Sequence, residues 1–131
     1  MSTFLHTKHF SLPEAQALLS LAIPLLKEIA ALKEKLDQRG FDVYRHQYFG
    51  GSGPNGDRFF PDELEHLVAT AKNLEKMGII LKNFEQGLID FPHIRSNGQE
   101  VYLCWKLGED EIKHWHGIPE GFVGRKPLDQ L

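Results

Sequence analysis

The chain has 131 residues, of which 41% are hydrophobic and 25% charged, the composition of one globular domain spanning residues 1–131. Its net charge is −3 and its lysines and arginines are spread along the chain, which excludes the clustered positive charge of a nucleic-acid-binding protein. The single cysteine, Cys104, cannot form an internal disulfide, and no secretory signal is evident at the first residues, so we predict a cytoplasmic protein. Charged residues interrupt the longest apolar run, and we expect no contact with a membrane.

The first predicted element is a long helix that begins after Ser11 and extends to about Gln38. Ser11 and Glu14 have the spacing of a capping box, and Pro24 predicts a kink rather than a break. Apolar residues recur along one face at spacings of three and four, at Ala15, Leu18, Ala22, Leu25, Ile29, Leu32 and Leu36. A second apolar strip lies beside them, at Leu19, Ile23, Leu26 and Ala30. Because one partner helix cannot cover both strips, we predict a homo-oligomer formed through this helix.

The next segment, residues 39–60, is rich in glycine and predicts a flexible loop. It lacks the Lys-Ser/Thr pair of a phosphate-binding loop, so we expect no nucleotide site there. A second helix of about 16 residues then begins at Pro61 and ends before Gly78. Residues 1–78 are therefore predicted to form an antiparallel helical hairpin.

After Gly78 the hydrophobic period changes to two, which is typical of strands. Four short runs show this pattern, at residues 79–82, 88–91, 101–105 and 112–116. Turn residues separate the runs, including the hairpin pair Asn97-Gly98. Residues 79–131 thus predict a small antiparallel β-meander of three to four strands, followed by a coil across the sheet. Together the two halves predict an α+β fold.

The register of the two hairpins decides which residues share a face. A two-residue turn at Asn97-Gly98 pairs Asp90 with Trp105, and a short turn after Lys106 then places His114 opposite Leu103. One face consequently carries four residues: Asp90, Trp105, His114 and His116. The other face carries Tyr102, Cys104, Lys106 and Trp115, unless a turn contains a bulge.

This register suggests a candidate metal site. His114 and His116 project two imidazoles to one side of a strand, and Asp90 can add a carboxylate, which is a ligand set for a divalent metal. The alternative is that His114 is a half-exposed strand residue and His116 binds a backbone carbonyl or Asp90. Cys104 can join a zinc cluster only through a bulge or an odd turn, and we predict that it is packed and unreactive. No cofactor is evident.

Three segments, residues 87–92, 103–109 and 115–127, carry a family resemblance that also includes residues 10–15. The chain resembles a bacterial family of uncharacterised proteins, domain of unknown function 2203. The resemblance implies a compact cytoplasmic domain and no known activity, cofactor or partner. It also implies a signature at Asp90, Cys104, Trp105, Gly108, Glu109, Trp115, His116, Gly121, Gly124 and Arg125. His114 stands where other residues are accepted, which weakens a metal site built on two histidines.

Two hypotheses for the function follow. An imidazole beside a guanidinium and a carboxylate can hold an anion or move a proton, so His116, Glu109 and Asp90 are candidate catalytic residues. Candidate residues for binding a small anionic ligand are Arg125, His116, Trp105 and Trp115. Alternatively, Arg125 is a structural pin on Asp90 or Glu109, and the tryptophans fill the core. We predict a self-associating interaction module with a small polar site; the alternative is a small-ligand or metal-dependent enzyme using Asp90, Glu109, His116 and Arg125.

Overall fold

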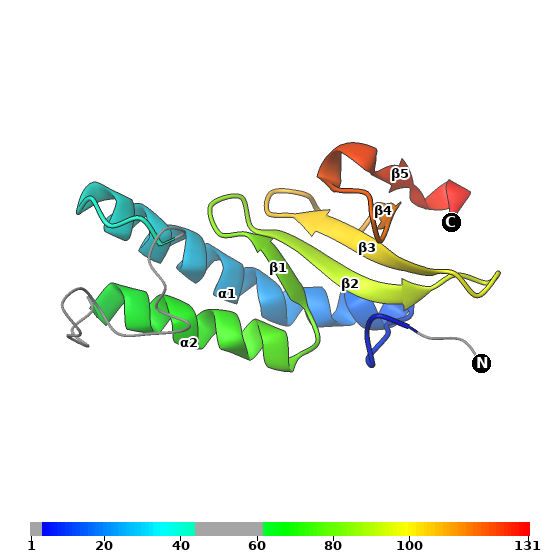
Figure 1. Ribbon diagram of the computed structural model, residues 1–131, viewed down its shortest axis with the longest axis horizontal. Coiled ribbons are helices and arrows are strands. Elements are labelled where there is room, and N and C mark those ends of the chain that lie inside the picture. The colour runs from blue at the N-terminus through cyan, green and yellow to red at the C-terminus, as the bar shows by residue number, and fades with distance from the viewer. Residues whose placement is uncertain (1–3, 44–61) are drawn as a thin grey trace.

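The computed structural model describes residues 4–43 and 62–131 and shows two helices followed by an antiparallel sheet (Figure 1). The helices are α1 (Leu12–Gln38) and α2 (Asp62–Lys76). The strands are β1 (Ile80–Asn83), β2 (Leu88–Ile94), β3 (Glu100–Lys106), β4 (His114–Gly117) and β5 (Lys126–Pro127), and they lie in chain order across the sheet. The predicted α+β class is confirmed. Most of the glycine-rich segment lies outside the described residues.

Local sequence signals explain the helix ends. At the start of α1, the Glu14 amide donates to the Ser11 hydroxyl at 3.2 Å and the Ser11 amide donates to the Glu14 carboxylate at 2.8 Å, which confirms the capping box. The helix continues through Pro24 without a break. After α2, Gly78 has a φ of +88°, and a Cβ there would lie 2.9 Å from the Lys8 side chain. Only glycine fits this helix stop without strain.

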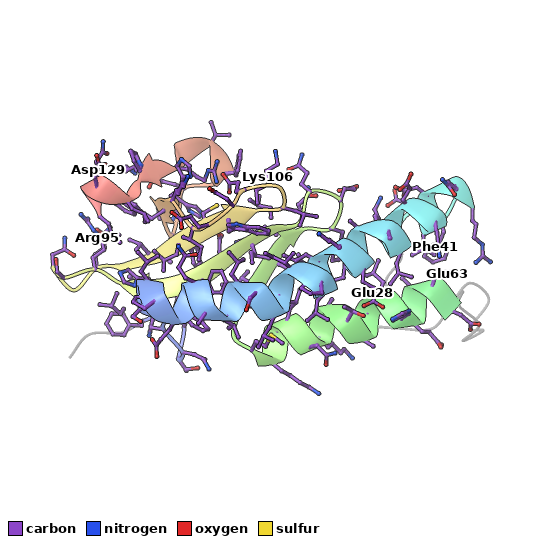
Figure 2. All side chains as sticks on the ribbon, turned by 180° about the vertical axis from the view of Figure 1, so that it is seen from behind. Glu28, Phe41, Glu63, Arg95, Lys106 and Asp129 are labelled. Atoms are coloured by element: carbon purple, nitrogen blue, oxygen red, sulfur yellow. The ribbon has the colours of Figure 1, made fainter. Side chains whose placement is uncertain are left out.

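The core lies between the two helices and one face of the sheet. α1 passes behind the sheet in Figure 1 and in front of it in the reverse view of Figure 2, where side chains fill the space between them. Residues from three neighbouring strands alternate toward this core: Ile89, Phe91, Val101, Leu103, Trp105 and Trp115. We call this side of the sheet the helix face and the opposite side the outer face.

The second apolar strip of α1 belongs to this core. Leu19 is 4% exposed and Leu26 is fully buried, while Ile23 is half-buried and packs against the same cluster. The expectation that a second copy must cover this strip is therefore wrong, because the chain's own core covers most of it. Self-association itself stays a prediction.

One described helix, α1, is long and apolar enough to cross a membrane by length and composition alone. This property is weak evidence, since helices in soluble cores and signal sequences share it. Here α1 contributes eight buried residues to the chain's interior. The absence of membrane contact stays a prediction.

The hairpin between β2 and β3 differs from its predicted register by one residue. Its loop has three residues rather than two, because the Arg95 amide donates to the Gln99 carbonyl at 2.8 Å and Gly98 takes a φ of +89°. Asn-Gly also suits this loop, in which a turn is followed by a glycine bulge. Asp90 consequently lies opposite Cys104, and the predicted pairing with Trp105 is wrong.

The β3–β4 connection is also different from the short turn that was predicted. Residues 107–113 form a longer connection, in which the Glu109 amide donates to the Lys106 carbonyl at 3.0 Å and the Lys106 amide donates to the Glu109 carboxylate at 2.8 Å. His114 therefore pairs with Cys104 instead of Leu103. With both hairpins shifted by one residue, Cys104 lies on the same face as Asp90.

The C-terminal segment is more ordered than the predicted coil. It turns back after β4 and adds β5, in which Lys126 pairs with Trp115, so the sheet has five strands rather than three or four. Two short 3₁₀ helices, Phe122–Gly124 and Leu128–Gln130, flank this strand. The Trp115 indole donates to the Pro127 carbonyl at 3.1 Å and ties the segment to the sheet. This reversal returns Arg125 to the neighbourhood of His116.

Candidate functional site

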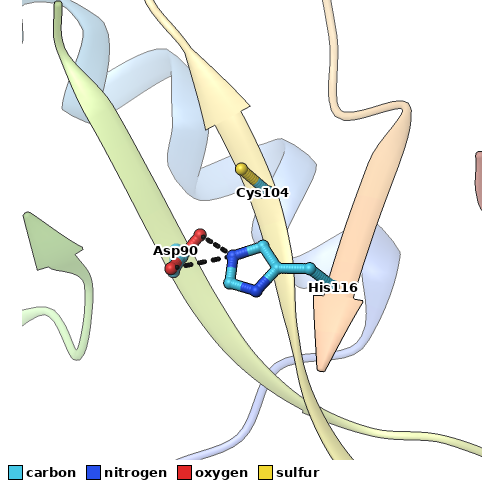
Figure 3. A group of neighbouring side chains, drawn as sticks. All are labelled: Asp90, Cys104 and His116. Atoms are coloured by element: carbon cyan, nitrogen blue, oxygen red, sulfur yellow. Dashed lines mark hydrogen bonds and ion pairs between the residues drawn. The ribbon is translucent and has the colours of Figure 1, made fainter. Parts of the chain in front are cut away.

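Three titratable side chains meet at the centre of the outer face. Asp90 from β2, Cys104 from β3 and His116 from β4 lie on adjacent strands and project to the same side (Figure 3). They are 1%, 1% and 3% exposed, respectively. A buried carboxylate is rare unless it is paired, and a buried histidine is uncommon, whereas burial of a cysteine is ordinary. We call these three residues the Asp-Cys-His cluster.

His116 has an acceptor at each ring nitrogen. Nε2 lies 3.1 and 3.2 Å from the two carboxylate oxygens of Asp90, and Nδ1 lies 2.9 Å from the carbonyl oxygen of Gly117. Burial by itself lowers the pKa of His116, but the bonds to Asp90 and Gly117 outweigh it, and the pKa lies above its usual value. The imidazole is thus held by a backbone carbonyl on one side and a carboxylate on the other.

Cys104 is a poor nucleophile in this setting. Burial, followed by the negative charge of Asp90, raises the pKa of its thiol to about 12, although the neighbouring guanidinium of Arg125 opposes this shift. The imidazole of His116 is hydrogen-bonded to Asp90 rather than placed as a base on the thiol. The prediction that Cys104 is buried is confirmed, but it faces the polar side of the sheet and not the core. A covalent mechanism through this thiol is not favoured.

Arg125 forms the edge of the cluster. Its Nη1 donates to both oxygens of Glu109 at 3.0 and 3.1 Å, and its guanidinium lies 4.1 Å from the centre of the Phe122 ring. The positive charge of the guanidinium also lowers the pKa of the Cys104 thiol, although burial and Asp90 outweigh this effect. The residues predicted for the polar site therefore lie in one region. His116 contacts Asp90, Arg125 contacts Glu109, and Cys104 lies between these two pairs.

Three other predicted site residues are not part of the cluster. His114 shares the outer face, but its Nδ1 lies 3.8 Å from the Glu109 carboxylate and has no hydrogen-bond partner. Trp105 and Trp115 point into the core on the helix face. The predicted site of Asp90 with two histidines is thus replaced by one histidine and Cys104, and the tryptophans fill the core.

The N-terminal segment adds contacts that the sequence did not reveal. His6 Nε2 lies 2.7 Å from the Tyr102 hydroxyl, and the Tyr102 ring packs edge-on against His116 with 5.4 Å between ring centres. Glu100 holds this segment by accepting from the amides of Leu5 and His6 at 2.8 and 3.0 Å. These contacts join segments about 95 positions apart, and nothing in the local sequence marks them.

The cluster has the donor set of a transition-metal site. One potential ligand atom from each of Asp90, Cys104 and His116 lies within 4.8 Å of the others. Ligand atoms around a tetrahedral zinc ion are roughly 3.5 Å apart, given bond lengths of about 2.0–2.3 Å, so the spacing of the three atoms is of the order that such a site requires. A thiolate with an imidazole and a carboxylate favours zinc over magnesium or calcium. No other such group is found in the described residues.

A search of protein families matches residues 8–128, nearly the whole chain, to a family described as Uncharacterized conserved protein (DUF2203). The chain belongs to this family. No curated protein and no solved structure matches the chain. The description of the family names no activity, ligand or partner.

Proposed function

We propose that this member of the family is a metal-binding domain that holds a zinc-type divalent ion on Asp90, Cys104 and His116. The observation that carries the proposal is the burial of three potential metal ligands, from three adjacent strands, around one point. The proposed site resembles the candidate metal site that the sequence suggested, Asp90 with His114 and His116, but has Cys104 in place of His114.

The surroundings of His116 support a metal ligand. In metal sites the second ring nitrogen of a ligating histidine usually donates to a carbonyl or carboxylate, which fixes the tautomer and aims the other nitrogen at the ion. Nδ1 of His116 faces the Gly117 carbonyl at 2.9 Å, and Nε2 points at Asp90. Metal binding then replaces the proton between Nε2 and Asp90 with the ion.

A bound ion would also offset the unfavourable free energy of the buried anionic side chains of the cluster. A thiol with a pKa near 12 and a buried carboxylate are unfavourable as free anions, yet both are favourable next to a divalent cation. Binding requires the loss of the Cys104 proton, which Arg125 assists. In the cytoplasmic setting that the sequence predicts, Cys104 stays reduced and available.

With three protein ligands, a four-coordinate ion keeps one position for water or a ligand. Such a site supports the metal-dependent enzyme hypothesis more directly than a purely structural role, because structural zinc sites use four protein ligands. The interaction module loses its main argument, since the strip on α1 packs inside the chain. No nucleic acid is expected as a partner.

Titration of the metal-free protein with zinc tests the proposal. We expect one ion per chain by calorimetry, with at least tenfold weaker binding in Asp90→Asn, Cys104→Ser and His116→Gln. His66, which pairs with Glu28 on the helices, supplies the control His66→Gln, and this variant should bind zinc like the wild type. Equal zinc affinity in the wild type and in all three cluster variants would refute the proposal.

A further inference from the structure

Arg125 is the cationic group placed next to the cluster, and it is fixed in position. Glu109 binds one of its nitrogens, Nη1, at 3.0 and 3.1 Å, and the Phe122 ring supports the guanidinium plane at 4.1 Å. Glu109 is itself anchored by the backbone amide of Lys106 at 2.8 Å. The arginine is thus held in one position, and the pairing of Lys126 with Trp115 places the preceding residue, Arg125, beside His116 of the cluster.

Exposure increases from the cluster toward this arginine. The side chains of Asp90 and His116 are 2% and 3% exposed, whereas those of Arg125 and Glu109 are 15% and 26% exposed. The Arg125–Glu109 pair is thus the more solvent-exposed of the two charged pairs.

We propose that the metal site binds an oxyanion, a carboxylate or a phosphate group, with one oxygen on the ion and the anion's charge held by Arg125. The inference rests on the proposed metal site. A guanidinium can donate to two oxygens of a planar carboxylate or a phosphate at once, and a divalent ion polarises the oxygen that it binds. Arg125 then acts as a binding residue, and Glu109 occupies the anion's place when the anion is absent.

The competing explanation is that the Arg125–Glu109 pair only pins the C-terminal segment to the sheet. The two explanations predict opposite effects for one substitution. If Glu109 competes with the anion, Glu109→Gln frees the guanidinium and strengthens anion binding. If the pair is only a pin, Glu109→Gln and Arg125→Gln loosen the same contact and behave alike.

The experiment uses the full chain loaded with cobalt(II), whose visible spectrum reports ligands on the metal. Inorganic phosphate is titrated in one arm and acetate in the other, so that the two anion classes are distinguished. We expect a saturable spectral change in at least one arm. Arg125→Gln should weaken that binding about tenfold or more, since a charge-assisted hydrogen bond is lost, and Glu109→Gln should strengthen it.

Two further variants keep the result interpretable. Arg125→Lys retains the positive charge but not the planar guanidinium that can donate to two oxygens at once. This variant should show an intermediate loss of anion affinity, even if Arg125→Gln folds poorly. Lys126→Gln removes the adjacent positive charge, which pairs with Glu120 at 2.9 Å, and should leave anion affinity unchanged.

The outcomes separate this inference from the proposed function. If cobalt binds through the cluster but neither anion changes the spectrum, the oxyanion inference is wrong and the metal site stands. If Glu109→Gln weakens anion binding as much as Arg125→Gln does, the pair is a pin and the inference is also wrong. If the wild type binds no metal, both proposals fail.

Discussion

The two faces of the sheet are built from alternating residues of the same strands, yet they differ completely in character. On the helix face, Phe91, Leu103 and Trp105 are buried among apolar side chains from both helices. One position away along the strands, Asp90 and Cys104 are equally buried but surrounded by charged and polar groups. Burial alone therefore does not distinguish the core from the site.

The difference shows how each face is stabilised. The helix face gains from apolar burial, which is favourable without any ligand. The outer face depends on a few directed contacts, such as the 3.1 Å contact between His116 and Asp90 and the ion pair between Arg125 and Glu109. Substitutions on the helix face should consequently affect folding, whereas those on the outer face should affect metal binding.

The largest expected effect is on the helix face. Phe91 is fully buried and packs edge-on against Phe10, so Phe91→Ala should lower the free energy of unfolding by about 3–5 kcal/mol. Urea denaturation measures this loss. The loss should be the same with and without zinc, and a zinc-dependent loss would contradict the separation between the two faces.

A similar loss is expected for the buried strip of α1. Leu26→Ala should lower the free energy of unfolding by about 2–5 kcal/mol, because Leu26 lies in the chain's own core. Denaturation at two protein concentrations checks the cause. If the strip formed an interface between two copies, the loss would change with protein concentration, and the packing described here would not account for it.

Zinc should stabilise the wild type by a smaller but specific amount. At a free zinc concentration of 100 times the dissociation constant, the expected gain is about 2.7 kcal/mol. The melting temperature of the wild type should therefore rise with zinc, and that of Cys104→Ser should not. An equal rise in both proteins would mean that the ion binds elsewhere.

The smallest expected effect concerns the pH dependence of the metal-free protein. Because the pKa of His116 is raised in the folded state, its contacts contribute fully to stability below its ordinary value of 6.5. This contribution is lost as the pH rises through the raised folded-state value. Denaturation of the chelator-treated protein across this range should show stability falling with pH, and His116→Gln should flatten the fall. An identical pH profile in both proteins would contradict the raised pKa.

Much of the fold could be predicted because its signals are local. The capping box at Ser11 and Glu14 set the start of α1, Gly78 ended the second helix, and the change of period after it gave the sheet. The family pattern likewise indicated Asp90, His116, Glu109 and Arg125, all of which the structure brings to one region.

The position of Cys104 in the Asp-Cys-His cluster could not be predicted, because a shift of one residue in the strand register moves it to the other face of the sheet. Asn97-Gly98 is most typical of a two-residue turn but also fits a three-residue loop, and each choice places Cys104 on a different face. The family pattern did include Cys104 next to Trp105, and this was the available signal. The contacts of His6 with Glu100 and Tyr102 of β3 had no such signal, since they depend on tertiary packing.

The central claim is that Asp90, Cys104 and His116 hold one metal ion. Its most direct test is a crystal of the zinc-loaded protein measured on both sides of the zinc absorption edge. We predict a single strong anomalous peak between the Cys104 sulfur, the Asp90 carboxylate and His116 Nε2, at about 2.0–2.3 Å from each ligand atom. A fully zinc-loaded crystal with no peak there, or with its zinc bound only at surface residues, would contradict the claim.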